Sequence, residues 1–175
     1  MSKNIVIGVG NILFNDDGIG VFTAHYLRKN FTYNPDIEIL DGGTLGFNLS
    51  EYFLEYDNVI IIDTISTDDR AGTIYKIPSD ILLGGNSYKK TAHEVEVLQI
   101  LEACELYGKR AEVTIFGIVP EDINSVNIGL SVTLRNKFDV FIQSVIEEIE
   151  GLDIKASKRA NVTIEKIIEE LKRTR

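Results

Sequence analysis

Five short runs of apolar residues punctuate the first two thirds of the chain. They are rich in β-branched side chains and are bounded by turn-forming residues, which is typical of buried strands. The runs are NIVIGVG (4–10), IEILDGG (37–43), NVIIIDT (58–64), GTIYKIP (72–78) and EVTIFGIVP (112–120). The pattern therefore predicts five strands.

Stretches with apolar residues at helical spacing accompany these runs. They cover 17–30, 45–56, 93–108 and 130–150. Strands that alternate with helices favour crossover connections and a largely parallel sheet. Only residues 64–71 join the third run to the fourth, too few for a parallel crossover, so 72–77 is predicted to be antiparallel. The expected fold class is α/β, with three layers: a twisted, mostly parallel sheet of about five strands, one of them antiparallel, and helices on both faces.

Length and composition indicate one domain with a substantial core, since the chain has 175 residues, 44% of them hydrophobic. We interpret residues 1–150 as a single α/β domain and 151–175 as a C-terminal helical extension. Asn161 is the expected cap of the helix in this extension. One apolar stripe of the helix is formed by Ile164, Ile167, Ile168 and Leu171.

The net charge of -9 argues against nonspecific binding to nucleic acid or to an anionic membrane surface, because both recruit basic patches. Small molecules and other proteins remain as partners. The single cysteine excludes an internal disulfide, and no apolar run approaches the ~18 residues of a membrane helix. We expect a cytoplasmic protein without membrane insertion.

Acidic residues follow the first three predicted strands. Asp16 and Asp17 come after the first, Asp41 ends the second, and Asp63 ends the third. Ligands of open α/β sheets bind at the carboxyl ends of the strands, so these acids are predicted to converge at one edge. Carboxylates that converge are costly unless a cation, a proton or donor groups lie among them. The pattern favours a metal or a cationic ligand.

Each of these acids also has a structural interpretation. Asp16 is expected to cap the following helix, which leaves Asp17 as the ligand candidate. Asp41 is able to brace the D-G-G-T turn or to bind a ribose. Asp63 is able to accept hydrogen bonds from the next loop.

Of the two histidines, His25 is expected on the solvated surface of the first helix. His93 opens a helix after a polar loop and is placed to project toward the carboxyl edge of the sheet. Together with Asp17 and Asp63 it completes an O,O,N ligand set for a divalent metal with open coordination positions.

The glycine-rich stretch VIGVGNILFNDDGIG (6–20) is similar to a dinucleotide fingerprint, but a third glycine is missing at the required spacing and two acids stand at the helix start. A nucleotide-binding protein is therefore the alternative. The sequence has neither a G-x-S-x-G elbow nor an H-E-x-x-H motif, and Cys104 lies among apolar residues like a core thiol. Covalent serine or cysteine catalysis is not expected.

Several motifs occur in a fixed order along the chain: G-V-G-N-I-L-F-N-D-D-G-I-G (8–20), D-G-G-T (41–44), I-I-D-T (61–64), the helix opened by His93, and F-G-I-V-P-E (116–121). Through these motifs the chain resembles, over residues 4–148, the [NiFe]-hydrogenase maturation endopeptidases. Such enzymes remove the C-terminal tail of the hydrogenase large-subunit precursor after nickel has been installed. The resemblance implies that Asp17, Asp63 and His93 are catalytic and bind the metal.

The resemblance further implies that the substrate supplies the nickel and that the protein holds no tightly bound metal of its own. The residues of the D-G-G-T turn are expected to contact the substrate: Asp41, Gly42, Gly43 and Thr44. The loop 84–92 is a candidate clamp for the extended tail. A noncatalytic nickel sensor or chaperone using the same ligands is the second alternative.

Overall fold

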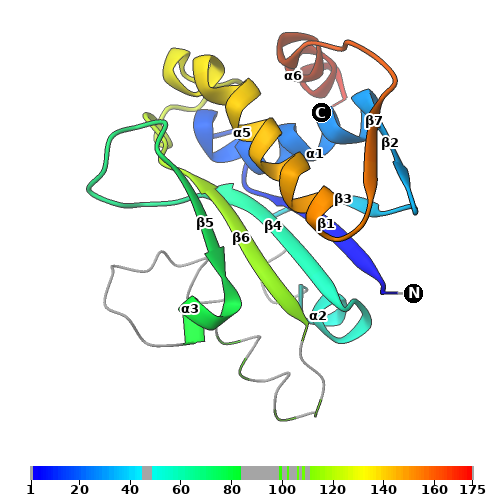
Figure 1. Ribbon diagram of the computed structural model, residues 1–175. Helices are drawn as coiled ribbons and strands as arrows, with labels where there is room; N and C mark the ends of the chain where they lie inside the picture. Colours follow the sequence, from blue (N-terminus) through cyan, green and yellow to red (C-terminus); the bar gives the residue numbers. More distant parts are fainter. Residues whose placement is uncertain are drawn as a thin grey trace.

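The computed structural model describes residues 2–44, 49–83, 99, 102, 106, 108 and 111–174. Its main sheet has five strands in the order β3-β1-β4-β6-β5 (Figure 1). The strands are β1 (Asn4–Val9), β3 (Glu38–Gly43), β4 (Asn58–Thr64), β5 (Ile74–Pro78) and β6 (Glu112–Ile118). All neighbours are parallel except β5, which pairs antiparallel with β6. The predicted fold class is confirmed, including its one antiparallel strand.

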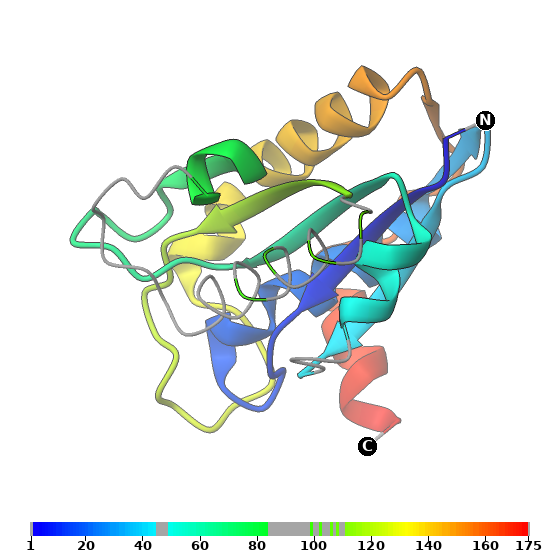
Figure 2. The ribbon, with the colours of Figure 1, turned by 90° about the horizontal axis from the view of Figure 1, so that it is seen from below.

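Helices cover both faces of this sheet (Figures 1 and 2). One face carries α1 (Ile19–Asn30) and α5 (Val132–Gly151), and the other carries α2 (Ser50–Glu55). Side chains of a strand alternate between the faces, so the two cores take alternate strand residues. In β4, Ile60 and Ile62 pack toward α1 and α5, whereas Val59 and Ile61 pack toward α2. A short helix, α3 (Ser79–Leu83), follows β5.

Glycines let α1 lie close against the carboxyl ends of β1 and β4. A Cβ atom on Gly20 would lie 2.2 Å from the carbonyl oxygens of both Val9 and Ile62, and one on Gly8 would lie 2.0 Å from the oxygen of Gly20. No side chain fits in these spaces. Gly20 thus provides the close helix-to-strand packing that the last glycine of a dinucleotide motif would provide.

The C-terminal segment adds a small second sheet that the apolar pattern does not predict. β2 (Phe31–Asn34) pairs antiparallel with β7 (Lys155–Lys158). The helix α6 (Ile164–Arg173) then lies against α1, and its apolar stripe joins the core beneath α1 and α5. Its cap is Thr163 rather than the expected Asn161, because the Thr163 side chain accepts a hydrogen bond from the Lys166 amide.

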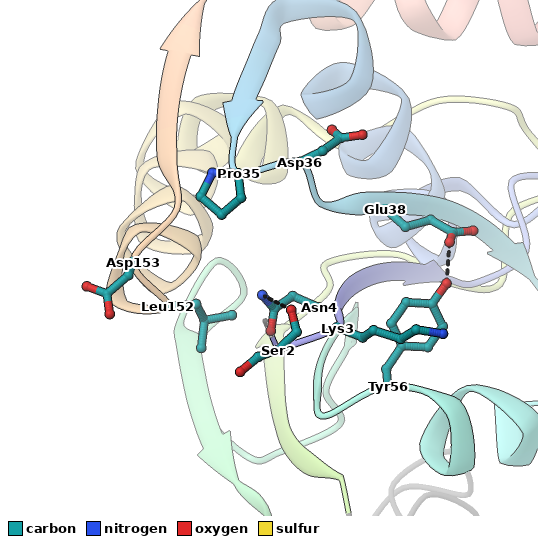
Figure 3. A pocket seen from close by; sticks show the side chains of 9 residues that line it. All are labelled: Ser2, Lys3, Asn4, Pro35, Asp36, Glu38, Tyr56, Leu152 and Asp153. Carbon is teal, nitrogen blue, oxygen red and sulfur yellow. Dashed lines mark hydrogen bonds between the residues drawn. The ribbon is translucent and has the colours of Figure 1, made fainter.

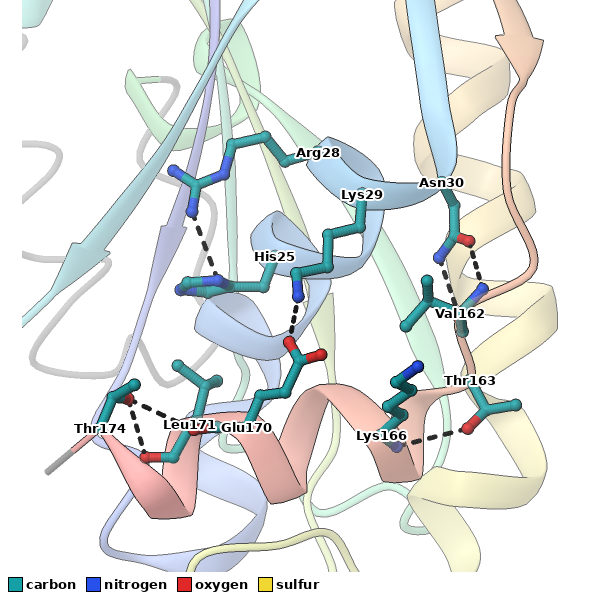
Figure 4. A network of polar contacts seen from close by, with 10 residues as sticks. All are labelled: His25, Arg28, Lys29, Asn30, Val162, Thr163, Lys166, Glu170, Leu171 and Thr174. Atoms are coloured by element: carbon teal, nitrogen blue, oxygen red, sulfur yellow. Dashed lines mark hydrogen bonds and ion pairs between the residues drawn. The ribbon is translucent and has the colours of Figure 1, made fainter.

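Polar contacts fix this segment to the last turn of α1 (Figure 4). The side chain of Asn30 is fully buried, donates to the Val162 carbonyl at 3.0 Å and accepts from the Val162 amide at 2.7 Å. Lys29 forms an ion pair with Glu170 of α6. The C-terminal segment therefore braces the helix whose other end begins beside the acids.

A hollow of about 730 Å³ opens at the amino edge of the sheet, where β1 and β3 begin (Figure 3). Within it, the Tyr56 hydroxyl donates to the Glu38 carboxylate, and this hydrogen bond is the main reason why the pKa of Tyr56 rises to about 12. The hollow lies at the opposite end of the strands from the predicted acid cluster. In the part of the chain that the structure describes, no helix is long and apolar enough to cross a membrane.

The close contact at Gly20 leads to a test of the packing. Gly20→Ala forces a methyl group against two backbone carbonyls, so we expect a loss of at least ~3 kcal/mol in the free energy of unfolding. Gly151→Ala is the matched control, since a Cβ there meets no atom within 4 Å; its effect should stay within ~0.5 kcal/mol. Urea denaturation of both variants measures the difference, and equal stability would contradict the packing described.

Candidate active site

The turn after β1 carries Asp17 back to the carboxyl edge of the sheet. Gly10 adopts a φ of 138°, and a Cβ at this position would lie 1.8 Å from the Asp17 carbonyl oxygen. Residues Asn15–Gly18 then form a short 3-10 helix, η1, that leads into α1. The Asp17 carboxylate accepts a hydrogen bond of 2.9 Å from the Asn11 amide, which fixes its direction.

Thr64, the last residue of β4, connects the two predicted acids. Its hydroxyl donates to Asp17 Oδ1 at 3.4 Å, and its amide donates to Asp63 Oδ1 at 2.7 Å. Asp63 is only 4% exposed. Carboxylates that come from different segments of the chain, 46 positions apart, therefore share one hydrogen-bonding residue. Sequence analysis did not assign this role to Thr64, although it is part of the I-I-D-T motif.

His93 lies outside the described residues, as do the loop 84–92, most of the predicted helix 93–108, and Cys104. Among the residues that are described, no three His, Cys, Asp or Glu side chains gather closely enough to hold a metal ion. The described part of the site thus consists of two carboxylates, the third predicted ligand being His93.

Asp16 differs from Asp17 in its burial and in its hydrogen-bond partners. Its side chain is fully buried, and its carboxylate accepts three backbone hydrogen bonds, from Glu121 at 2.9 Å, Asp122 at 3.0 Å and Ser131 at 2.6 Å. The expectation that Asp16 caps its own helix is wrong, because neither η1 nor α1 has a side-chain cap. The carboxylate instead ties the turn after β1 to the loop between β6 and α5.

Asp41 faces α1 and is engaged on both of its oxygens. Oδ1 accepts from the Gly43 amide at 3.0 Å, so that Asp41 braces its own turn. Oδ2 lies 2.8 Å from Nε2 of His25. The Gly43 carbonyl in turn accepts from the Gly10 amide at 2.8 Å, which joins the D-G-G-T turn to the turn that carries Asp17.

The expectation that His25 is a solvated surface residue is also wrong. Its side chain is only 16% exposed because it packs between α1 and β3 against Asp41. Nδ1 lies 3.3 Å from the guanidinium of Arg28 (Figure 4). Because a guanidinium can only donate, Nδ1 accepts, and Nε2 donates to Asp41. No described hydrogen bond joins this His25–Asp41 pair to Asp17 or Asp63.

Several solved structures share this architecture. The chain superposes on the hydrogenase maturating endopeptidase HybD of Escherichia coli with a TM-score of 0.78 and 27% identity, covering 90% of this chain and 98% of that one. A [NiFe] hydrogenase maturation protease of Thermococcus kodakarensis shares the fold with a TM-score of 0.65 at 23% identity, over 86% and 98% of the two chains.

Sequence comparison leads to the same group. A family model of hydrogenase maturation proteases matches residues 21–148, which is well over half of the chain. A putative hydrogenase maturation protease of Methanocaldococcus jannaschii is 30% identical over 83% of this chain and 96% of its own length. The hydrogenase 2 maturation protease of Escherichia coli is 29% identical over 89% and 95%.

The chain therefore belongs to the hydrogenase maturation protease family. This makes it a hydrolase, a peptidase of hydrogenase maturation, and confirms the family to which the sequence motifs point.

The two neighbouring acids should respond differently to mutation. Asp16→Ala leaves three backbone amides without their acceptor, so we expect a loss of about 3 kcal/mol in the free energy of unfolding. Asp17→Ala removes one amide contact and one long hydroxyl contact at the rim, and should cost less than ~1 kcal/mol. Denaturation curves of both variants would contradict this account if Asp17→Ala were the more destabilising change.

Proposed function

We propose that the protein removes the C-terminal tail of the nickel-loaded [NiFe]-hydrogenase large-subunit precursor, and that Asp17, Asp63 and His93 bind the nickel that this substrate carries. The observation that supports this most is the Thr64 bridge, since it gathers two acids of separate segments at one edge of the sheet.

The chemistry of the proposed donors fits such a metal. Oxygen ligands from carboxylates, together with an imidazole nitrogen, suit a divalent ion of intermediate softness such as nickel. Asp63 is almost fully buried, and an adjacent carboxylate raises the electrostatic cost of keeping both charged. A cation brought by the substrate offsets this repulsion, so that the precursor with its metal binds better than the precursor without it.

The Asn11 amide and the Thr64 hydroxyl leave other lone pairs of Asp17 for the metal, and they hold the carboxylate in one orientation. Thr64 positions Asp63 in the same way through its amide. This arrangement resembles the support that other metal sites receive from groups that hydrogen-bond to the ligands.

The reaction is hydrolysis of one peptide bond. Water adds its oxygen to the carbonyl carbon, the bond from that carbon to nitrogen breaks, and the released amine takes a proton from the water. Bound beside the scissile bond, nickel would polarise water or carbonyl as a Lewis acid. The carboxylates orient the substrate through its metal. In this proposal the enzyme is a metal-dependent, aspartic-type endopeptidase, with Asp17 and Asp63 as its catalytic acids.

The turn of Asp41, Gly42, Gly43 and Thr44 is proposed to contact the substrate chain. Thr44 is exposed, and the turn is bonded to the Gly10 turn through the Gly43 carbonyl. Because both oxygens of Asp41 are already engaged, by Gly43 and His25, we assign Asp41 the task of holding this turn in shape beside the substrate.

Substitution of the proposed ligands tests the function. Asp17→Asn, Asp63→Asn and His93→Ala should each abolish cleavage of the nickel-loaded precursor, because a site with three ligands loses most of its metal affinity when one is removed. The folded state should persist in all three. A gel-mobility assay of the precursor, run beside thermal melts, measures both effects.

Val140→Ala is the control, since Val140 lies on the exposed side of α5, is 57% exposed and takes no part in the site. It should cleave at the wild-type rate. Wild-type activity of Asp63→Asn would refute the ligand assignment. A wild-type protein that binds the nickel-loaded precursor and leaves its tail intact would instead be a sensor or chaperone.

A further inference from the structure

A second hollow lies beside the loop that follows β4, has apolar and polar residues in its lining, and contains none of the site residues assigned so far. It has a volume of about 430 Å³ and is formed by the loop that follows β4, by β5 and by α3. Its apolar lining comes from Ile65, Tyr75, Ile77 and Ile81. This volume falls within the ~300–1,000 Å³ typical of binding pockets.

Strand register places this hollow in line with the acid. Asp63 of β4 pairs with Gly117 of β6, and Gly117 pairs with Tyr75 of β5. The three residues form one row across neighbouring strands. Asp63 has the same alternation as Val59 and Ile61, and Tyr75 packs with the core on that side, so both point to the α2 face of the sheet.

The middle of the row has no side chain of its own. A Cβ on Gly117 would lie 1.9 Å from Cδ1 of Ile65, so Ile65 covers this position and connects the acid to the hollow with an apolar surface. Strands are about 4.8 Å apart, which puts the backbone of Tyr75 ~10 Å from that of Asp63. An extended peptide advances about 3.3 Å per residue and covers this span in roughly three residues.

The rim of the hollow, as far as the described residues form it, is polar. Asp68 and Asp69 lie there, and Asp69 accepts a hydrogen bond from the Tyr75 hydroxyl. Lys76, the one cation of the described lining, forms an ion pair with Glu148 of α5. These polar residues are already engaged within the protein, which leaves the apolar lining to receive a ligand.

We infer that this hollow is a specificity subsite for the substrate peptide: it takes an apolar side chain about three residues from the scissile bond. The inference rests on the proposed function, because that function puts the scissile bond beside Asp63. It identifies Ile81, which is 45% exposed at the mouth of the hollow, as a residue that sets specificity.

A charge exchange between enzyme and substrate tests the subsite. Ile81→Glu should raise KM for the nickel-loaded precursor at least tenfold and leave kcat within twofold, since the chemistry at Asp63 is untouched. In a series of precursors, the residues near the cleavage site are replaced by Lys one at a time. The Lys substitution at one position, about three residues from the scissile bond, should raise KM for the wild-type enzyme. The Ile81→Glu enzyme should process that same Lys precursor with its KM restored toward the wild-type value.

Val140→Glu, an equal change of charge on the exposed side of α5, is the matched control and should leave KM unchanged. Thermal melts verify that each variant is folded, and Ile81→Ala, which only shortens the side chain, should raise KM about threefold. Any of three results would overturn the subsite. The first is an unchanged KM in Ile81→Glu, and the second is a similar rise of KM in Val140→Glu. The third is that no Lys precursor has its KM restored by the Ile81→Glu enzyme. These results would leave the proposed function standing if Asp63→Asn were inactive, whereas activity of Asp63→Asn would refute both.

Discussion

The buried carboxylate of Asp16 is the constraint on which the edge of the sheet depends. A charged group without solvent is tolerated only when hydrogen bonds replace its water, and three backbone amides of residues 121–131 do so here. One of these is the amide of Ser131, whose side chain caps α5 by accepting from Leu134. The same carboxylate thus fixes the turn after β1 and the start of the longest helix, and Asp17 follows directly in the chain.

Next to the Asp16 carboxylate, the close packing of α1 on β1 and β4 sets the direction of the turn after β1. Gly10 and Gly20 allow backbone segments to approach where no side chain fits, and Asn11 and Thr64 then hold the Asp17 carboxylate. The packing of the fold consequently supplies the geometry of the site. Substitutions at Asp16 or Gly20 act on stability, and those at Asp17 or Asp63 act on the chemistry that we propose.

Much of the main sheet could be predicted from the sequence, because its strands are continuous apolar runs bounded by turn residues and because the short connection 64–71 allows only an antiparallel strand. The pair β2 and β7 could not, since FTYN and KASK carry little apolar periodicity and become strands only by pairing across more than a hundred positions. The roles of Asp16 and His25 were missed for the same reason. A helix cap and a solvated helix face are local interpretations, whereas the actual partners lie on a distant loop and on β3. The sequence placed Asp17 and Asp63 at the same edge of the sheet, because both follow parallel strands, but the role of Thr64, which hydrogen-bonds to both, was visible only in three dimensions.

Nickel X-ray absorption of the precursor complex tests the central claim most directly, because it reports the ligands of the metal that the substrate brings. The nickel-loaded precursor is mixed with the wild-type protein and frozen before cleavage, in parallel with Asp63→Asn. Our account predicts that the wild-type protein adds oxygen and nitrogen ligands to the nickel and that Asp63→Asn adds fewer. A nickel spectrum that does not change when the active wild-type protein binds would contradict it.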